Sequence, residues 1–222
     1  MERSRYPAFV ASCLALATLL LTAPVAIGQA TGDAGPDATD TPETASPQSE
    51  RPKASAGKDP AEVRKAHLDS LFAQLADADN PNWERVQGQI WSTWRESGSP
   101  SMNLLLNRAS RAMENKAYDR ALDFLDDLVR LAPDFAEAWN MRATVHFLTG
   151  SYGRSMADIE RTLALEPRHF GAMAGLGIIL DRTGNEAGAL GVYRRVIELH
   201  PNMEGAREGI DRLAPEIDGR SI

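Results

Sequence analysis

A repeat with a constant period of 34 residues constrains the fold of this chain more than any other feature. Proline ends a Leu-X-Pro triplet at positions 133, 167 and 201, so successive prolines are 34 residues apart. Small and large apolar residues return with the same period, at Ala121, Ser155 and Ala189 and at Leu125, Ile159 and Tyr193. A period of this length is typical of helix–turn–helix units that stack into a solenoid. The sequence therefore predicts an all-α fold built from antiparallel helix pairs.

The period divides residues 99–214 into three helix pairs and one further helix. The repeats span 102–135, 136–169 and 170–203, with helices expected near 100–114, 118–131, 136–149, 152–165, 170–182 and 186–199. A last helix at 203–213 is expected to cap the third repeat, and residues 215–222 form a tail. Gly150 and Gly184 fall at the turn inside a repeat, where glycine takes a left-handed conformation at low cost. Lys116 replaces this glycine in the first repeat.

A separate helical hairpin is predicted at residues 60–98, in front of the repeats. Asp59 suits the N-cap of its first helix and Pro60 suits the first turn. Because the hairpin does not match the period, we expect it to act as a terminal cap. Its tryptophans are expected to pack between two apolar faces, and the alternative is an aromatic patch that binds a ligand. The tryptophans are Trp83, Trp91 and Trp94, and the apolar faces are Leu68–Leu75 and Leu104–Leu106.

The first 30 residues have the order of a secretory signal peptide. Two arginines precede an apolar run from Ala8 to Leu21, and small residues follow at Ala26, Gly28 and Ala30. This order predicts export with cleavage after Gly28 or Ala30; the alternative is an uncleaved membrane anchor. Cys13 stands in a sequence that resembles a lipoprotein cleavage box, but the longest apolar segment follows it, which argues against lipidation. We expect a periplasmic mature protein without cysteine and without stable membrane insertion.

Residues 31–59 contain many Pro, Ser, Thr, Ala and Gly residues and no large apolar side chain. Such a segment cannot offset its ordering entropy by burial, so we predict a disordered linker between the signal peptide and the hairpin. The whole chain has a net charge of −7. This charge argues against a nucleic-acid partner bound by neutralisation of its phosphates.

The repeats resemble the tetratricopeptide repeat (TPR) family, whose pattern sets large residues, small residues and a terminal proline at fixed positions. The second repeat carries Trp139, Ala143, Gly150, Tyr152, Ser155, Ile159 and Pro167, and the third carries Leu176, Gly177, Gly184, Ala189, Tyr193 and Pro201. The first repeat fits at Leu105, Ala109, Tyr118, Ala121, Leu125 and Pro133. The resemblance covers about half of the chain. It implies a right-handed α-solenoid whose first helices line a concave groove that usually holds a protein segment.

The resemblance places nine residues on the concave face: Asn107, Ser110, Asn140, Met141, Thr144, Phe147, Ala174, Gly175 and Ile178. Family members that bind chaperones hold a C-terminal carboxylate with a clamp of lysines, arginines and asparagines. That clamp is absent, because the matching positions are Leu106, Ser110, Met141, Gly171 and Gly175. We therefore expect an extended or helical segment of a protein partner in this groove. The alternative is that Phe147 and Met141 only pack between repeats.

The four histidines give no pattern of metal ligands, because each lacks a second ligand at a suitable spacing. They are His67, His146, His169 and His200. His146 is expected to be a hydrogen-bonded core residue, and His169 and His200 to be exposed in turns. The sequence predicts neither a metal site nor a cofactor.

Two further patterns favour structure over chemistry. Gly171, Gly175 and Gly177 lie inside a predicted helix without a phosphate-loop lysine, so helix packing accounts for them. An acidic cluster on the second helix of the first repeat is expected to be a solvated face with charge pairs. It consists of Asp123, Asp126 and Asp127 beside Arg120 and Arg130. With no nucleophile or triad signature, we predict that the protein is not an enzyme.

The sequence thus favours an exported protein-interaction scaffold, because an export signal precedes three registered repeats. The alternative is a structural component of a cell-envelope assembly that self-associates through its terminal helices.

Overall fold

The computed structural model describes residues 59–219, which form helices joined by short turns. The predicted signal peptide, Cys13 and residues 31–58 of the predicted linker lie outside the described residues, as do residues 220–222. None of the helices in the described part is long and apolar enough to cross a membrane. These helices are α2 (Pro60–Leu75), α3 (Trp83–Trp94), α4 (Pro100–Glu114), α5 (Tyr118–Leu131), α6 (Ala136–Leu148), α7 (Tyr152–Leu165), α8 (Phe170–Arg182), α9 (Glu186–Leu199) and α10 (Glu204–Asp218).

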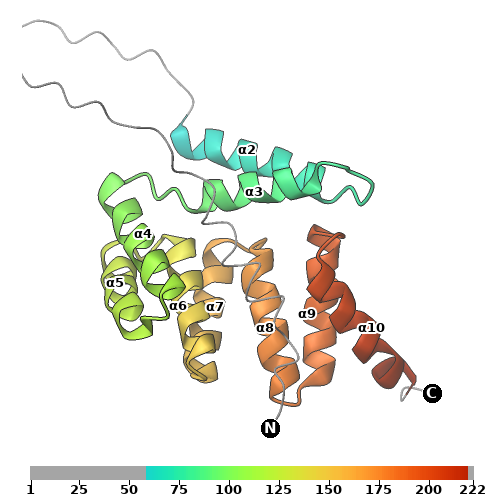
Figure 1. Ribbon diagram of the computed structural model, residues 1–222. Helices are drawn as coiled ribbons and strands as arrows, with labels where there is room; N and C mark the ends of the chain where they lie inside the picture. Colours follow the sequence, from blue (N-terminus) through green and yellow to red (C-terminus); the bar gives the residue numbers. More distant parts are fainter. Residues whose placement is uncertain (1–58, 220–222) are drawn as a thin grey trace, which may run out of the picture.

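The repeats form three pairs of antiparallel helices, α4 with α5, α6 with α7 and α8 with α9. Figure 1 shows the helices from α4 to α10 standing side by side in chain order. Small residues let the helices of a pair approach closely: Ala109 and Ala143 are buried, and a Cβ on Gly177 would lie 2.5 Å from the Tyr193 ring. The predicted all-α solenoid of antiparallel helix pairs is confirmed.

The turn inside each repeat has a left-handed residue. Gly150 and Gly184 have φ of +76° and +82°, and Lys116 has φ of +57°. Within residues 59–219, Lys116 is the only non-glycine residue with a positive φ. The same backbone hydrogen bond, 2.8 Å long, closes the three turns, from Ala117 N to Ala112 O, Ser151 N to His146 O and Asn185 N to Leu180 O. The repeat therefore imposes on Lys116 a conformation that disfavours a Cβ.

The last helix packs against α9, but it is longer than predicted. It passes through Pro215 and ends at Asp218, so the expected end before Pro215 is wrong. Proline removes one backbone donor and crowds the preceding turn. Contacts beyond Pro215 offset this loss, because Ile217 packs against the core and Arg194 Nη2 donates to Asp218 Oδ2 at 2.7 Å.

The hairpin of α2 and α3 does not stack in front of the first repeat as a terminal cap, so that prediction is wrong. It crosses the solenoid at one edge, near the turns that join α7 to α8 and α9 to α10 (Figure 1). The buried face of Leu68–Leu75 shares a core with Trp94 and Phe170. Leu104, by contrast, is 51% exposed, and Leu106 belongs to the separate core of the first repeat. The predicted tryptophan contact with Leu68–Leu75 is confirmed, and the one with Leu104–Leu106 is wrong.

An ion pair and aromatic contacts hold the hairpin on the turn between α7 and α8. Arg168 Nη1 donates to Asp69 Oδ1 at 2.7 Å, and the Arg168 Cζ atom lies 4.4 Å from the centre of the Phe72 ring. The Trp94 ring stacks on the His169 ring with 4.1 Å between their centres and 12° between their planes. Aromatic pairs at such distances contribute about 0.5–1.5 kcal/mol beyond the area that they bury.

A second set of contacts holds the hairpin on the turn between α9 and α10. His200 Nε2 lies 2.5 Å from Gln87 Oε1, and the centres of the His200 and Trp83 rings are 5.4 Å apart. Both His169 and His200 have an exposed fraction of 0%. The prediction that these two histidines are exposed is wrong, because the hairpin covers the turns in which they stand.

Candidate functional site

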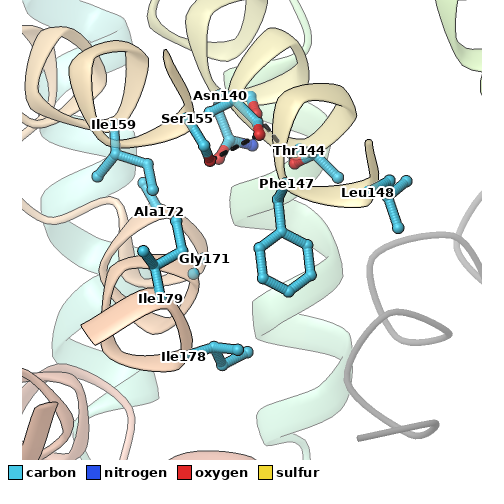
Figure 2. A pocket seen from close by; sticks show the side chains of 12 residues that line it. Asn140, Thr144, Phe147, Leu148, Ser155, Ile159, Gly171, Ala172, Ile178 and Ile179 are labelled. Atoms are coloured by element: carbon cyan, nitrogen blue, oxygen red, sulfur yellow. Dashed lines mark hydrogen bonds between the residues drawn. The ribbon is translucent and has the colours of Figure 1, made fainter. Parts of the chain in front are cut away.

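The described part of the chain has an open pocket between α6 and α8, to which α7 contributes (Figure 2). The space in and above the pocket, including open solvent at its mouth, is about 540 Å³. Its lining residues are Asn140, Ala143, Thr144, Phe147 and Leu148 of α6, Ser155 and Ile159 of α7, and Gly171, Ala172, Gly175, Ile178 and Ile179 of α8.

Most of this lining is apolar, and two of its residues, Phe147 and Gly175, make it accessible to a ligand. Phe147 is half-buried, so that part of its ring remains available to a ligand. At Gly175 an added Cβ would have the Cδ1 atom of Ile159 as its nearest neighbour, at 3.7 Å. Because that distance is an ordinary contact, Gly175 relieves no clash, and it adds room to the pocket. The pocket is therefore suited to an apolar side chain.

Three polar side chains also line the pocket. Ser155 Oγ donates to Ala143 O at 2.8 Å, and Thr144 Oγ1 donates to Asn140 O at 2.9 Å (Figure 2). Both hydroxyl protons are thus used by the backbone of α6. The side-chain amide of Asn140 is the remaining polar group with donors for a ligand.

The structure brings five of the nine predicted groove residues together in this pocket, namely Asn140, Thr144, Phe147, Gly175 and Ile178. Asn107 is exposed and Ser110 is half-buried on α4, and neither lines the pocket. Met141 is 7% exposed in the core of the first two repeats, and Ala174 is 0% exposed in the core shared with the hairpin. The placement of Met141 and Ala174 on an accessible groove surface is wrong, because neighbouring helices cover both side chains.

The two ends of the pocket are built differently. At the C-terminal end of α6, Arg182 Nη1 donates to the Tyr152 hydroxyl at 2.9 Å, and its Cζ atom lies 5.1 Å from the centre of the Phe147 ring. At the N-terminal end of α8, a Cβ on Gly171 would lie 2.6 Å from Cη2 of Trp91. The hairpin therefore packs against Gly171, which lines one end of the pocket. Gly171 makes room for Trp91, whereas its sequence suggested packing between repeats.

A buried polar network reaches the pocket at Asn140. Glu137 and His169 are 3% and 0% exposed. Glu137 Oε2 accepts from Asn140 Nδ2 at 3.1 Å and lies 3.2 Å from His169 Nε2. The family pattern does not predict Glu137 or His169 as residues near the groove.

A second network lies on α6 beside α5 and α7 and serves packing. Arg142 donates to both carboxylate oxygens of Asp158, at 2.8 and 2.7 Å, and to Asp126 at 2.8 Å. The hydrogen bonds with Asp158 raise the pKa of Arg142. Asp126 bonds to another helix, yet its side chain is 65% exposed, and Asp123 and Asp127 are exposed as well, so the solvated face predicted for this cluster is confirmed. Asp127 does pair with Arg130, at 2.8 Å.

His146 is buried next to this network, as predicted. Its Nε2 atom lies 3.8 Å from Asp158 Oδ2, which is beyond hydrogen-bonding distance. The expected hydrogen bond is therefore not formed with this carboxylate, and burial lowers the pKa of His146. Within residues 59–219, no group of three or more His, Cys, Asp or Glu side chains is placed to hold a metal ion.

Solved structures of known proteins share this fold. The chain matches the Sgt2 TPR domain from Aspergillus fumigatus with a TM-score of 0.51 at 22% identity, over 55% of this chain and 83% of that domain. It matches the first TPR domain of Spaghetti (RPAP3), bound to the HSP90 peptide SRMEEVD, with a TM-score of 0.50 at 20% identity, over 53% of this chain and 93% of that one. At these identities the likeness concerns the fold.

Sequence comparisons identify the family. The family model described as tetratricopeptide repeat matches residues 106–161 and 152–204. A TPR repeat-containing protein of Rhizobium etli is 42% identical over 156 residues, which are 70% of this chain and 76% of that protein. The chain therefore belongs to the tetratricopeptide repeat family.

Proposed function

We propose that this protein is a scaffold that binds a segment of a protein partner in the groove between α6 and α8. The observation that carries the proposal is the open pocket, whose apolar walls surround one polar side chain with donors for a ligand, Asn140. Apolar pockets with a few placed polar groups are the usual form of ligand sites. The scaffold that we propose carries out no reaction.

The partner segment that fits this pocket has one apolar side chain and a backbone that runs past Asn140. Phe147 and Ile178 would contact the apolar side chain, and the Asn140 amide would contact the backbone. The HSP90 peptide bound to the TPR domain of Spaghetti supports a peptide as the class of ligand. Leu106 and Met141 are buried apolar residues at positions where a carboxylate clamp would need a lysine, arginine or asparagine, so the segment need not end in a free C-terminus.

A pull-down with groove variants tests this proposal. The mature protein, captured from its native compartment after crosslinking, is compared with Phe147→Ala and Asn140→Ala. We expect each variant to lose at least about tenfold in recovery of the partner, because a buried anchor contributes about 2 kcal/mol or more. Leu131→Ala is the matched control, since Leu131 is 53% exposed and does not line the pocket. Equal recovery by all three variants would place the binding surface elsewhere.

The proposed site of action is the periplasm. The support is the order of a basic start, an apolar run and small residues in the first 30 residues. Mass spectrometry of the protein from a periplasmic fraction should give a mature N-terminus after Gly28 or Ala30. Recovery of the intact chain in the membrane fraction would favour the anchor, and a lipid on Cys13 would favour a lipoprotein.

Self-association is a second candidate function, favoured by the exposure of Leu104. Leu104 stands one period before Ala138 and two before Ala172, which are 0% and 1% exposed because the preceding repeat covers them. The face of α4 that holds Leu104 is the open end of the solenoid. Light scattering of the mature protein tests this role: a dimer that Leu104→Asp dissociates supports it, and a monomer at high concentration excludes it.

A further inference from the structure

The buried network of Glu137, Asn140 and His169 occurs in one repeat only. One period before and one period after Glu137 stand Asn103 and Gly171, and the counterparts of Asn140 are Leu106 and Ala174. The counterparts of His169 are Phe135 and Met203. A solenoid of this type therefore stacks without the network. Burying a carboxylate costs free energy unless its partners compensate it, so its presence here needs a reason other than stacking.

In this network, the donor and acceptor of each hydrogen bond determine the donor and acceptor of the next. Ala172 N donates to His169 Nδ1 at 3.1 Å, so Nδ1 is unprotonated and Nε2 carries the ring proton. Nε2 can then only donate, and its partner at 3.2 Å, Glu137 Oε2, is the acceptor. An acceptor at Oε2 requires a donor on Asn140, so that Nδ2, and not Oδ1, faces Glu137 at 3.1 Å. The backbone of α8 thereby sets the orientation of the Asn140 amide.

Two tryptophans of the hairpin pack against His169, the residue at which this series of hydrogen bonds begins. The Trp94 ring lies parallel to the His169 ring, and the Trp91 ring meets it edge-on at 5.4 Å between ring centres. The two tryptophan rings therefore pack against the imidazole, which is 0% exposed. Within residues 59–219, no Lys or Arg forms an ion pair with Glu137, so His169 and Asn140 are its only side-chain partners there.

We propose that Glu137 and His169 are positioning residues that orient the Asn140 amide in the groove, and that the hairpin holds them in place. Within the described residues, Asn140 Oδ1 accepts no hydrogen bond, and one N–H of Nδ2 remains after the bond to Glu137. A fixed amide with one donor and one acceptor matches the N–H and C=O of a peptide bond. The groove therefore recognises the backbone of an extended segment, which deepens the proposed function and rests on it.

The orientation of Asn140 can be measured without the partner. In the ¹⁵N-labelled mature protein, the side-chain amide protons of Asn140 should exchange with water at least about tenfold more slowly than those of Asn107, which is exposed on α4. Glu137→Leu removes the acceptor and should abolish this difference. Glu137→Gln keeps an acceptor oxygen and should retain it. A Glu137→Leu variant with unchanged Asn140 protection would overturn the positioning role.

Three further variants, one at His169 and two in the hairpin, keep the proposal falsifiable if Glu137→Leu does not fold. His169→Asn keeps a side chain that can cap α8 but is too short to reach Glu137, and it should also abolish the slow exchange. Trp94→Leu removes the stacked ring and should accelerate exchange of the Asn140 amide protons. Trp83 contacts His200 and not His169, so Trp83→Leu should leave this exchange unchanged. Equal effects of the two tryptophan variants would contradict the coupling to the hairpin.

N-methylacetamide serves as a probe for backbone recognition, because it carries one peptide bond and no side chain. Titration into the wild-type protein should shift the side-chain amide signals of Asn140 and leave those of Asn107 unchanged. The shift should be lost in Glu137→Leu and kept in Glu137→Gln. No shift at Asn140 would exclude recognition of the peptide bond, while the pull-down with Phe147→Ala tests partner binding independently.

Discussion

The three repeats and the N-terminal hairpin are both built from antiparallel helix pairs, but they bury their apolar faces against different neighbours. Each repeat packs against the next one along the chain, α5 against α6 and α7 against α8. The hairpin packs across the chain: the pair of Asp69 and Arg168 joins residues 99 positions apart, and Gln87 with His200 spans 113. The period of a sequence reports contacts that recur in every unit. It contains no information about contacts that are made once.

The largest expected effect concerns the hairpin side of this comparison. Trp94→Ala should lower the free energy of unfolding by about 3–5 kcal/mol, because it leaves a cavity beside Phe72, His169 and Phe170. Hydrogen exchange should show the loss of protection in α2, α3 and the start of α8. The first repeat should keep its protection, because its core is separate.

Trp94→Phe is the matched control for this prediction. Trp94 Nε1 is buried without a hydrogen-bond partner in the described residues. Phenylalanine removes this unsatisfied donor and keeps an aromatic ring against His169, so its cost should be much smaller than that of alanine. Uniform loss of protection from α4 to α10 in Trp94→Ala would contradict a core shared only by the hairpin and the last helices.

The next effect is a pH dependence located at the second turn under the hairpin. Burial lowers the pKa of His200 from 6.5 to about 4, and the charge of Arg207 acts in the same direction. Between these two values the unfolded chain binds a proton that the folded chain does not bind. The free energy of unfolding therefore falls as the pH falls from 6.5 to 4, by up to about 3 kcal/mol.

Urea unfolding at several pH values between 4 and 7 measures this term. The control is His200→Phe, which fills the same space and cannot titrate. The wild type should lose more stability than His200→Phe over this range, and the difference isolates His200 from the carboxylates and from His146. Identical pH profiles for the two proteins would show that His200 is protonated at little cost.

A smaller change in stability distinguishes Gly171, which accommodates the hairpin, from Gly191, which does not contact it. Gly171→Ala should cost about 1–2 kcal/mol, because its Cβ would lie 2.6 Å from Trp91 Cη2. In a Trp91→Ala background the same substitution should cost nothing. Gly191→Ala is the control on α9, where an added Cβ meets nothing within 4 Å, and it should stabilise by about 0.5–1 kcal/mol. A double-mutant cycle without coupling between positions 91 and 171 would refute this contact.

The smallest expected effect lies in the first repeat. Lys116→Gly should raise the free energy of unfolding by about 0.5–1 kcal/mol, since φ of +57° disfavours a residue with a Cβ. Gly150→Ala should destabilise by a similar amount for the same reason. Thermal unfolding of both variants gives the two signs, and a destabilised Lys116→Gly would show that the Lys116 side chain contributes more than its backbone strain costs.

The sequence predicted the repeats well because local patterns determine them. The prolines at 133, 167 and 201 and the glycines at 150 and 184 fix where helices start and turn. It did not predict where the hairpin docks, because His169, Phe170 and His200 are not part of the period. A histidine before an apolar helix reads as an exposed turn residue until a tryptophan from a distant segment covers it.

The candidate groove was predicted in part for the same reason. Asn140, Thr144, Phe147, Gly175 and Ile178 follow from family positions and line the pocket. Met141 stands one period before Gly175, and Ala174 stands one period after Asn140. Packing of the second helices and of the hairpin nevertheless buries both side chains. The network through Glu137 depends on contacts between two repeats and the hairpin, which no single window of sequence contains.

The proposed groove is tested most directly by photo-crosslinking from inside it. A photoreactive amino acid at position 144, which lines the pocket, is compared with the same residue at position 123, which is exposed on α5. After irradiation in the native compartment, we predict a crosslinked protein partner from position 144 and none from position 123. Crosslinks from position 123 alone, or from both positions to the same partner with equal yield, would contradict binding in the groove between α6 and α8.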